Sequence, residues 1–143
     1  MGDDFLPDPA TPFGERVRRR LREAPAAWLT TVGADGTPQP NPVWFIWEEA
    51  SLLVYNRPDA HRLTHIRRRP RVSFNLDSNG QGGDIVVLTG TAALAHGVPA
   101  PHELPEYVQK YSDRMVRVSG TLEEFSRQYP VALRIQELRV RGF

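Results

Sequence analysis

The sequence predicts a small α+β domain whose centre is an antiparallel β-barrel of six strands. The chain has 143 residues, of which 40% are hydrophobic. A chain of this length buries roughly two thirds of the surface that it exposes when unfolded, which is enough for one core. Six segments either alternate between apolar and polar residues or are rich in β-branched and aromatic residues. Helical patterns fall in the N-terminal region, in one short segment at 59–68 and in one late insertion, so the helices are expected at the periphery.

The N-terminal region divides into a tail and a helix. Residues 1–10 are acidic and contain two prolines, which predicts a disordered or loosely docked tail. The domain then spans residues 11–143. Thr11 and Pro12 form the pattern of an N-cap followed by proline at the first helical position. The helix is expected to end before Pro25.

The six strands are predicted at Ala26–Val32, Val43–Trp47, Leu52–Tyr55, Arg71–Leu76, Asp84–Ala95 and from Val131 toward Val140. Pro38, Pro40 and Pro42 precede the second strand at every second position. One side of that segment therefore lacks N–H groups and must lie along a sheet edge or a bulge. Gly90 predicts a bulge or a close backbone approach within the fifth strand. The glycine-rich residues 78–83 are expected to form a hairpin loop.

The remaining helices are predicted at 59–68, 106–116 and 121–128. The last two belong to a helical insertion at about 100–128. Thr121 and Glu124 have the spacing of a capping box, in which each side chain bonds the other residue's backbone N–H.

Composition excludes several functional classes. The chain has no cysteine, so disulfides, cysteine-ligated metals and thiolate nucleophiles are excluded. Its net charge of +1 does not suit a nucleic-acid binder, and Arg67–Arg71 closes a helix without interleaved aromatics. The apolar runs, such as Val43–Trp47, are far shorter than the roughly twenty residues that span a bilayer. The acidic N-terminus lacks a basic signal region, so we expect a cytoplasmic protein.

The segment from Tyr55 to Leu63 is the most informative for function. A strand ends there, and a helix begins with His61 and Arg62 in its first turn. Cations at this position oppose the helix dipole. A bound anion would relieve the conflict, because free N–H groups and basic side chains would converge on it. The alternative is that both side chains point into water, and the spacing alone leaves the two interpretations open.

No side-chain catalyst is evident from the motifs. His61 and His65 stand four residues apart, as a metal pair would, but no acidic third ligand accompanies them, and no metal site is expected. Residues 78–83 lack the pattern of a phosphate-binding loop. Neither a serine elbow nor a pair of glycosidase carboxylates appears.

The order of several motifs resembles the pyridoxamine-phosphate-oxidase-like split β-barrel family over residues 12–143. The motifs are WLTTV at 28–32, DGTPQP at 35–40, VWF at 43–45, RLTHI at 62–66, RPRV at 69–72 and VVLTGTA at 86–92. The ending VALRI at 131–135, followed by RVRGF at 139–143, is similar to the actinobacterial branch that uses the deazaflavin coenzyme F420. The resemblance implies a six-stranded antiparallel split β-barrel with peripheral helices. It also implies a homodimer with a flavin or deazaflavin in each of two interface grooves.

The resemblance carries functional residues over one position at a time. In the flavin-dependent oxidases, the corner after the strand carries Thr, Ser, Arg and Lys around the FMN phosphate. The matching residues here are Asn56, Ala60, His61 and Arg62. An Arg and a Lys of those oxidases fall on Asn41 and Ile46, so pyridoxamine-phosphate oxidase activity is not expected. The F420 branch keeps a basic residue at the position of Arg62.

The resemblance therefore favours an F420-dependent reductase that transfers hydride from the reduced deazaflavin to a small conjugated acceptor. The alternatives are an FMN-binding flavoprotein and a non-enzymatic F420- or flavin-binding or storage protein. The cofactor-binding residues implied are Asn41, Pro42, Val43, Trp44, Tyr55, Asn56, Arg57, Ala60, His61 and Arg62.

Overall fold

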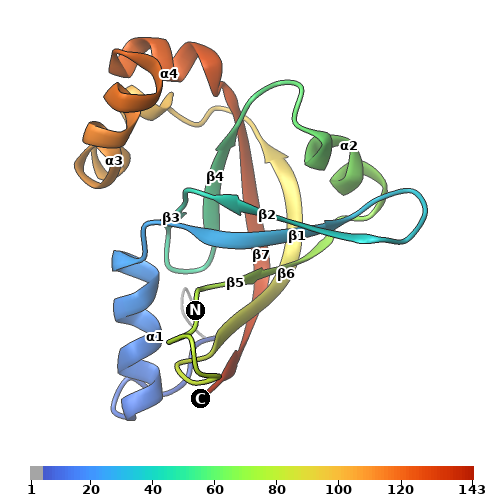
Figure 1. The fold of residues 1–143 in the computed structure, drawn as a ribbon, viewed down its shortest axis with the longest axis vertical. Helices are drawn as coiled ribbons and strands as arrows, with labels where there is room; N and C mark the ends of the chain where they lie inside the picture. Colours follow the sequence, from blue (N-terminus) through green and yellow to red (C-terminus); the bar gives the residue numbers. More distant parts are fainter. Residues whose placement is uncertain (1–4) are drawn as a thin grey trace.

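Seven strands form one antiparallel sheet in the order β2-β1-β5-β6-β7-β4-β3, in a computed structural model that describes residues 5–143. The sheet curls into a half-barrel with helices around it (Figure 1). The strands are β1 Ala27–Val32, β2 Pro38–Val43, β3 Ile46–Trp47, β4 Leu52–Asn56, β5 Arg71–Asn75, β6 Val86–Ala95 and β7 Val131–Gly142. The helices are α1 Pro12–Glu23, α2 His61–Arg68, α3 Pro105–Ser119 and α4 Leu122–Gln128, with a short 3-10 helix at Pro101–Glu103.

The predicted strand Val43–Trp47 is the main correction to the sequence-based fold. The chain divides there into β2 and β3, which lie at opposite edges of the sheet, so the strands number seven rather than six. At the break, the Phe45 N–H donates to the Tyr111 hydroxyl (3.0 Å), and Lys110 Nζ donates to the Phe45 carbonyl (3.0 Å). Side chains of α3 thus replace the sheet hydrogen bonds that this buried backbone would otherwise need.

The prolines lie on the outer edge of β2, as the sequence predicts. The Gly33 N–H donates to the Thr37 carbonyl at 3.2 Å, so the hydrogen-bonded pairs that follow in register are those of Gln39, Asn41 and Val43 with β1, and the prolines stand at the alternate positions. Alternate residues of an antiparallel strand bond to opposite sides. The N–H groups of β2 therefore face β1, and the prolines face the open edge, which offers no N–H donor to another strand.

Helix α1 is confirmed with its predicted cap, since the Thr11 hydroxyl accepts from the Gly14 N–H at 3.0 Å. The expected tail is more closely docked than predicted over residues 5–10. Leu6 is only 9% exposed, and Phe5 packs against the core because α1 leaves apolar surface beside it. The part of the predicted tail at residues 1–4 lies outside the described residues.

The long hairpin β6–β7 contains the predicted irregularity at Gly90. The register between the two strands shifts between Thr89 and Thr91. A Cβ atom at Gly90 would lie 2.7 Å from the Gln136 carbonyl oxygen, so only glycine fits this close approach. The glycine-rich residues 78–83 connect β5 and β6, which pair antiparallel as predicted for a hairpin.

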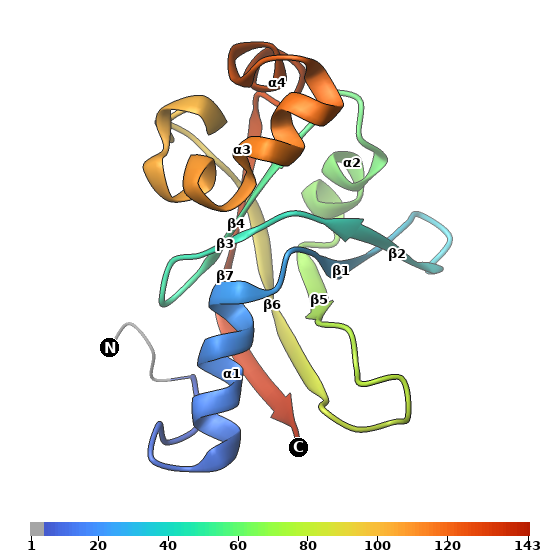
Figure 2. The ribbon, with the colours of Figure 1, turned by 60° about the vertical axis from the view of Figure 1, so that its left-hand side comes forward.

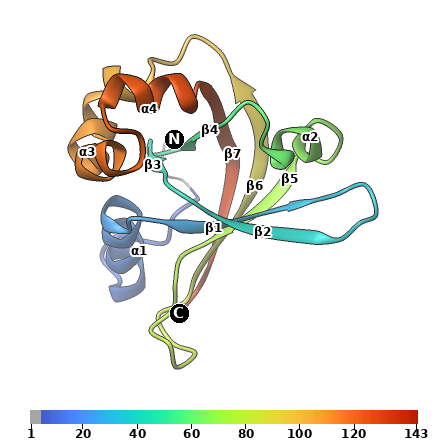
Figure 3. The same ribbon diagram turned by 45° about the horizontal axis from the view of Figure 1, so that its top comes forward.

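Two apolar clusters hold the elements together. The first fills the curled sheet and packs against α1 and α2. The second joins α3 and α4 to the sheet at β3, β4 and β7. Figure 2 shows α3 and α4 together at one end of the sheet, and Figure 3 shows them across β4 and β7 from α2. The helical insertion therefore forms a wall of its own.

The predicted capping box at the start of α4 is only half formed. The Thr121 hydroxyl accepts from the Glu124 N–H at 3.0 Å. The Glu124 carboxylate binds Arg127 and Gln128 instead of reaching back to Thr121, because an arginine one turn later competes for it.

Candidate functional site

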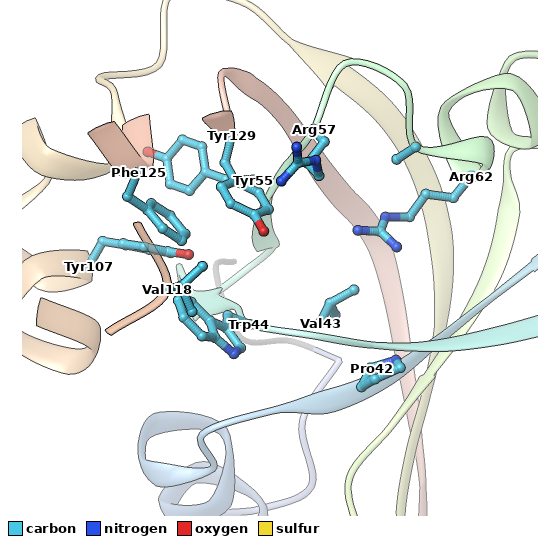
Figure 4. Close-up of a pocket in the computed structure, with 11 residues that line it drawn as sticks. Pro42, Val43, Trp44, Tyr55, Arg57, Arg62, Tyr107, Val118, Phe125 and Tyr129 are labelled. Carbon is cyan, nitrogen blue, oxygen red and sulfur yellow. The ribbon is translucent and has the colours of Figure 1, made fainter. Parts of the chain in front are cut away.

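A cavity of about 320 Å³ lies where the end of β2, the end of β4, the start of α2 and the two helices of the insertion meet. Figure 4 shows its lining side chains. Seven of the ten residues implied by the resemblance line it: Pro42, Val43, Trp44, Tyr55, Arg57, Ala60 and Arg62. Segments far apart in the sequence therefore form one site, with the size of a small-molecule pocket.

Arg62 carries the charge at the α2 side of the cavity. Its Nε donates to Asn56 Oδ1 at 2.5 Å. Asn56 is fully buried, and its Nδ2 lies 3.0 Å from the carbonyls of both Val54 and Val131. Because both ends of the Asn56 amide bind protein atoms, Asn56 orients the guanidinium instead of reaching a ligand itself. Figure 4 shows the far end of that guanidinium pointing into the cavity.

The start of α2 is deficient in negative charge. Ala60 occupies the N-cap without a side-chain hydrogen bond, and no acidic residue lies in the first turn. The first N–H groups of a helix have no partner within it, so this end favours an anion. Burial lowers the pKa of Arg62, but an arginine stays charged at neutral pH.

Arg57 supplies a second cation, between Arg62 and the aromatic rings. Its guanidinium lies 5.5 Å from the centre of the Tyr129 ring, and its Nε is 3.9 Å from the Asp59 carboxylate. The side chain is largely exposed, so it lies at the cavity mouth rather than in the interior.

Aromatic rings form the opposite side of the cavity. Trp44 stacks on Phe125, with ring centres 5.4 Å apart and planes 6° apart, and also on Tyr111 at 5.0 Å. Phe125 stacks in turn on Tyr129 at 4.4 Å. Tyr107 meets Tyr55 edge to face at 4.9 Å. These near-parallel rings, stacked on one another, make this side of the cavity an apolar aromatic wall, which suits a flat conjugated molecule.

Three residues implied by the resemblance do not line the cavity. Asn41 is exposed and pairs with Leu29 in the sheet. Asn56 lies behind Arg62, and His61 is exposed in the first turn of α2. His65, the other histidine of that helix, hydrogen-bonds the Thr31 hydroxyl through Nδ1 at 2.8 Å.

Four lining residues were not anticipated: Tyr107, Val118, Phe125 and Tyr129. All belong to the helical insertion or follow it directly. Their apolar spacing along α3 and α4 is the ordinary pattern of core-facing helices, so the sequence contained no signal that they border a cavity.

Residues 13–141 match the family model described as pyridoxamine 5'-phosphate oxidase. The chain belongs to the pyridoxamine 5'-phosphate oxidase family. No protein of curated function matches it. Within residues 5–143, no helix is long and apolar enough to cross a membrane, and no three metal-binding side chains converge.

Solved structures with the same fold have different biochemical roles. A conserved hypothetical protein of Mycobacterium tuberculosis is 16% identical, with a TM-score of 0.66 over 96% of this chain and 89% of that one. An F420 reductase is 20% identical, with a TM-score of 0.58 over 83% and 90%. A heme storage protein of Vibrio cholerae is 18% identical, with a TM-score of 0.58 over 90% and 94%. At these identities the likeness concerns the fold, and the chemistry must be argued from the cavity.

Proposed function

We propose that this member of the pyridoxamine 5'-phosphate oxidase family is an F420-dependent reductase that transfers hydride to a small conjugated acceptor. The observation that carries the proposal is a single cavity with Arg62 on one side and stacked aromatic rings on the other. F420 is a flat deazaflavin ring joined to an anionic phosphate tail, so its two parts match the two sides. When bound, it supplies the two-electron hydride chemistry that the side chains lack.

The residues of the chain would hold and orient this cofactor. Arg62, fixed by Asn56, would bind the phosphate together with the first N–H groups of α2. Val43 and Trp44 would contact the ring from the end of β2. Helices α3 and α4 would keep water from the reacting face, because they supply one whole wall of the cavity.

F420 is favoured over FMN by what surrounds the anion site. Ala60 has no hydroxyl, and the Asn56 amide is occupied by protein carbonyls, so neither grips a phosphate as the oxidases' hydroxyls do.

The test is a titration of the ligand-free protein with oxidised F420, followed by fluorescence, with FMN titrated in parallel. We expect saturable F420 binding that is at least about tenfold tighter than FMN binding, followed by turnover of reduced F420 with a panel of conjugated acceptors. A yellow preparation that releases FMN would overturn the choice of cofactor. Tight F420 binding without turnover of any acceptor would favour the storage function instead.

A further inference from the structure

A second hollow, separate from the cavity described above, lies between α1 and α3. Its volume is about 450 Å³. Figures 1 and 2 show the two helices on the same side of the sheet, with β3 between them. This α1–α3 groove shares no lining residue with the proposed cofactor cavity, so a ligand bound in it would occupy a site of its own.

Three apolar side chains line part of the α1–α3 groove: Leu21 from α1, and Ile46 and Trp47 from β3. Leu21 and Ile46 are buried, and Trp47 is half-buried. The Trp47 ring is held in place because its Nε1 donates to the Glu49 carbonyl at 2.8 Å. The groove therefore offers a fixed apolar surface to the body of a ligand.

Lys110 of α3 brings a partly buried ammonium to the same groove. Its Nζ donates to the Phe45 carbonyl at 3.0 Å and lies 4.0 Å from the centre of the Phe45 ring. Its pKa, lowered to about 8 by burial and then by the cation Arg114, keeps the amine mostly charged at neutral pH. Within residues 5–143 it forms no ion pair, although an ammonium has three N–H donors and buried charges are normally paired. The ammonium can therefore still bind an anion.

Arg22 supplies a second cation from the last turn of α1. Its guanidinium lies 5.9 Å from the centre of the Trp47 ring and, among the described residues, pairs with no carboxylate. Glu106, which is exposed, is the acid of the groove, and in the described part of the chain it binds neither cation. Two cations and one acid leave the groove with a single excess positive charge.

We propose that the α1–α3 groove binds a small carboxylate with an apolar body. The carboxylate would accept hydrogen bonds from Lys110 and Arg22, and the body would lie against Trp47 and its apolar neighbours. A singly charged head group matches the excess charge of the groove, and its oxygens are the acceptors that the ammonium lacks. This site goes beyond the proposed function and does not depend on it, because the two sites share no lining residue.

The experiment is calorimetric titration of the full-length, ligand-free protein with octanoate and with 1-octanol, which has the same apolar chain without the charge. Lys110→Met should weaken octanoate binding at least about tenfold, as loss of a partly buried charge-assisted hydrogen bond does. Arg22→Gln should weaken it about two- to fivefold, because the ion pair at this position is exposed. Neither variant should change the affinity for octanol.

Glu106→Gln gives the sharpest test, because it should strengthen binding. Removing the acid of the groove removes its repulsion of the carboxylate, so octanoate affinity should rise about two- to fivefold while octanol affinity stays the same. Glu106 is exposed and forms no ion pair among the described residues, so its replacement should leave folding unchanged.

Two further arginine variants are controls. Arg67→Gln removes one charge from an exposed position of α2 that lines neither site, and it should leave octanoate affinity unchanged. Arg62→Gln reports whether the probe enters the proposed cofactor cavity instead, and it should also leave octanoate affinity unchanged.

Absence of octanoate binding to wild type, or equal octanoate affinity in wild type, Lys110→Met and Arg22→Gln, would overturn the proposal. A loss in Arg62→Gln in place of Arg22→Gln would overturn it too, because the carboxylate would then lie in the other cavity. If Lys110→Met lost octanol affinity as well, the groove would have collapsed, and the opposite shifts expected for exposed Arg22→Gln and Glu106→Gln would decide. Failure of F420 to bind would overturn the proposed function alone.

Discussion

Arg62 and Asn56 act as a unit at the scale of single residues. The resemblance implies that both contact the cofactor, but the structure buries Asn56 and bonds it to Arg62 at 2.5 Å. This contact also gives Arg62 a part in the stability of the fold. Its removal leaves Asn56 Oδ1 buried without a partner, which costs on the order of 1 to 3 kcal/mol of stability.

We predict that Arg62→Ala weakens F420 binding by roughly ten- to a hundredfold, because a charge-assisted hydrogen bond to phosphate contributes about 1.5 to 3 kcal/mol. His61→Ala should cost less, since His61 is exposed outside the cavity. Arg68→Ala, at the other end of α2, is the control and should bind normally. Fluorescence titration well below the melting temperature of each variant separates binding from folding. Wild-type affinity in Arg62→Ala would show that the anion site lies elsewhere.

Lys110, the only lysine of the chain, makes stability depend on pH. Burial, and then the charge of Arg114, lowers its pKa from 10.5 to about 8. The Phe45 ring, whose centre lies 4.0 Å from Nζ, favours the charged form and works against this decrease. Below about pH 8 the Lys110 amine is charged in both the folded and the unfolded chain. Burying this charge then lowers the stability of the folded chain. At higher pH, up to about 10.5, the unfolded chain holds a proton that the folded chain has released, so stability rises.

Urea unfolding of wild type and Lys110→Met between about pH 7 and about pH 9.5 tests whether stability rises with pH. The stability of wild type relative to the variant should increase across that range. A difference that stays constant would mean that the ring contacts hold the pKa near its ordinary value.

At the scale of elements, the hairpin β6–β7 depends on the close approach at Gly90. We predict that Gly90→Ala destabilises the fold by about 1 to 3 kcal/mol, because the new Cβ would meet the Gln136 carbonyl and the side chains of Ile135 and Leu138 within 3 Å. Thr89→Ala, beside it but half exposed, is the control and should cost much less. Thermal melting measures the stability of both variants. Equal losses of stability in Gly90→Ala and Thr89→Ala would show that the hairpin relaxes around the added methyl group.

Helix α4 depends on its cap, and the cavity depends on α4. The Thr121 hydroxyl bonds the Glu124 N–H, and Phe125 lies one residue farther along the helix that positions the aromatic wall. Thr121→Ala should cost about 1 kcal/mol of stability and weaken F420 binding, while Thr121→Ser should restore both. If Thr121→Ala lost stability but bound F420 normally, the wall would not depend on this cap.

At the scale of the whole molecule, we propose a homodimer with the cofactor site at its interface. The aromatic residues Trp44 and Phe45 do not supply this interface, because Phe45 is fully buried and Trp44 stacks within the same chain. Another surface does support it. Trp28, 39% exposed, pairs with Pro42 across β1 and β2, and Pro42 also lines the cavity, so apolar surface continues from the cavity rim onto the sheet.

Light scattering at micromolar concentration should give a mass of about twice 16.2 kDa. Trp28→Ser should shift the population toward monomer, because it removes the exposed ring. A wild-type mass equal to that of one chain would contradict the dimer.

The sequence by itself determined the local elements, because periodicity, proline and glycine act over a few residues. It located α1 with its cap, the proline edge of β2, the bulge at Gly90 and the strand-to-helix corner that contains Arg62. Tertiary contacts alone decided the rest. Lys110 and Tyr111 satisfy the Phe45 backbone from sixty-five and sixty-six residues away and so split one predicted strand into two. The same packing of α3 and α4 onto β4 brings Tyr107 and Phe125 to the cavity, where no local pattern distinguishes a ligand-facing aromatic residue from a core one.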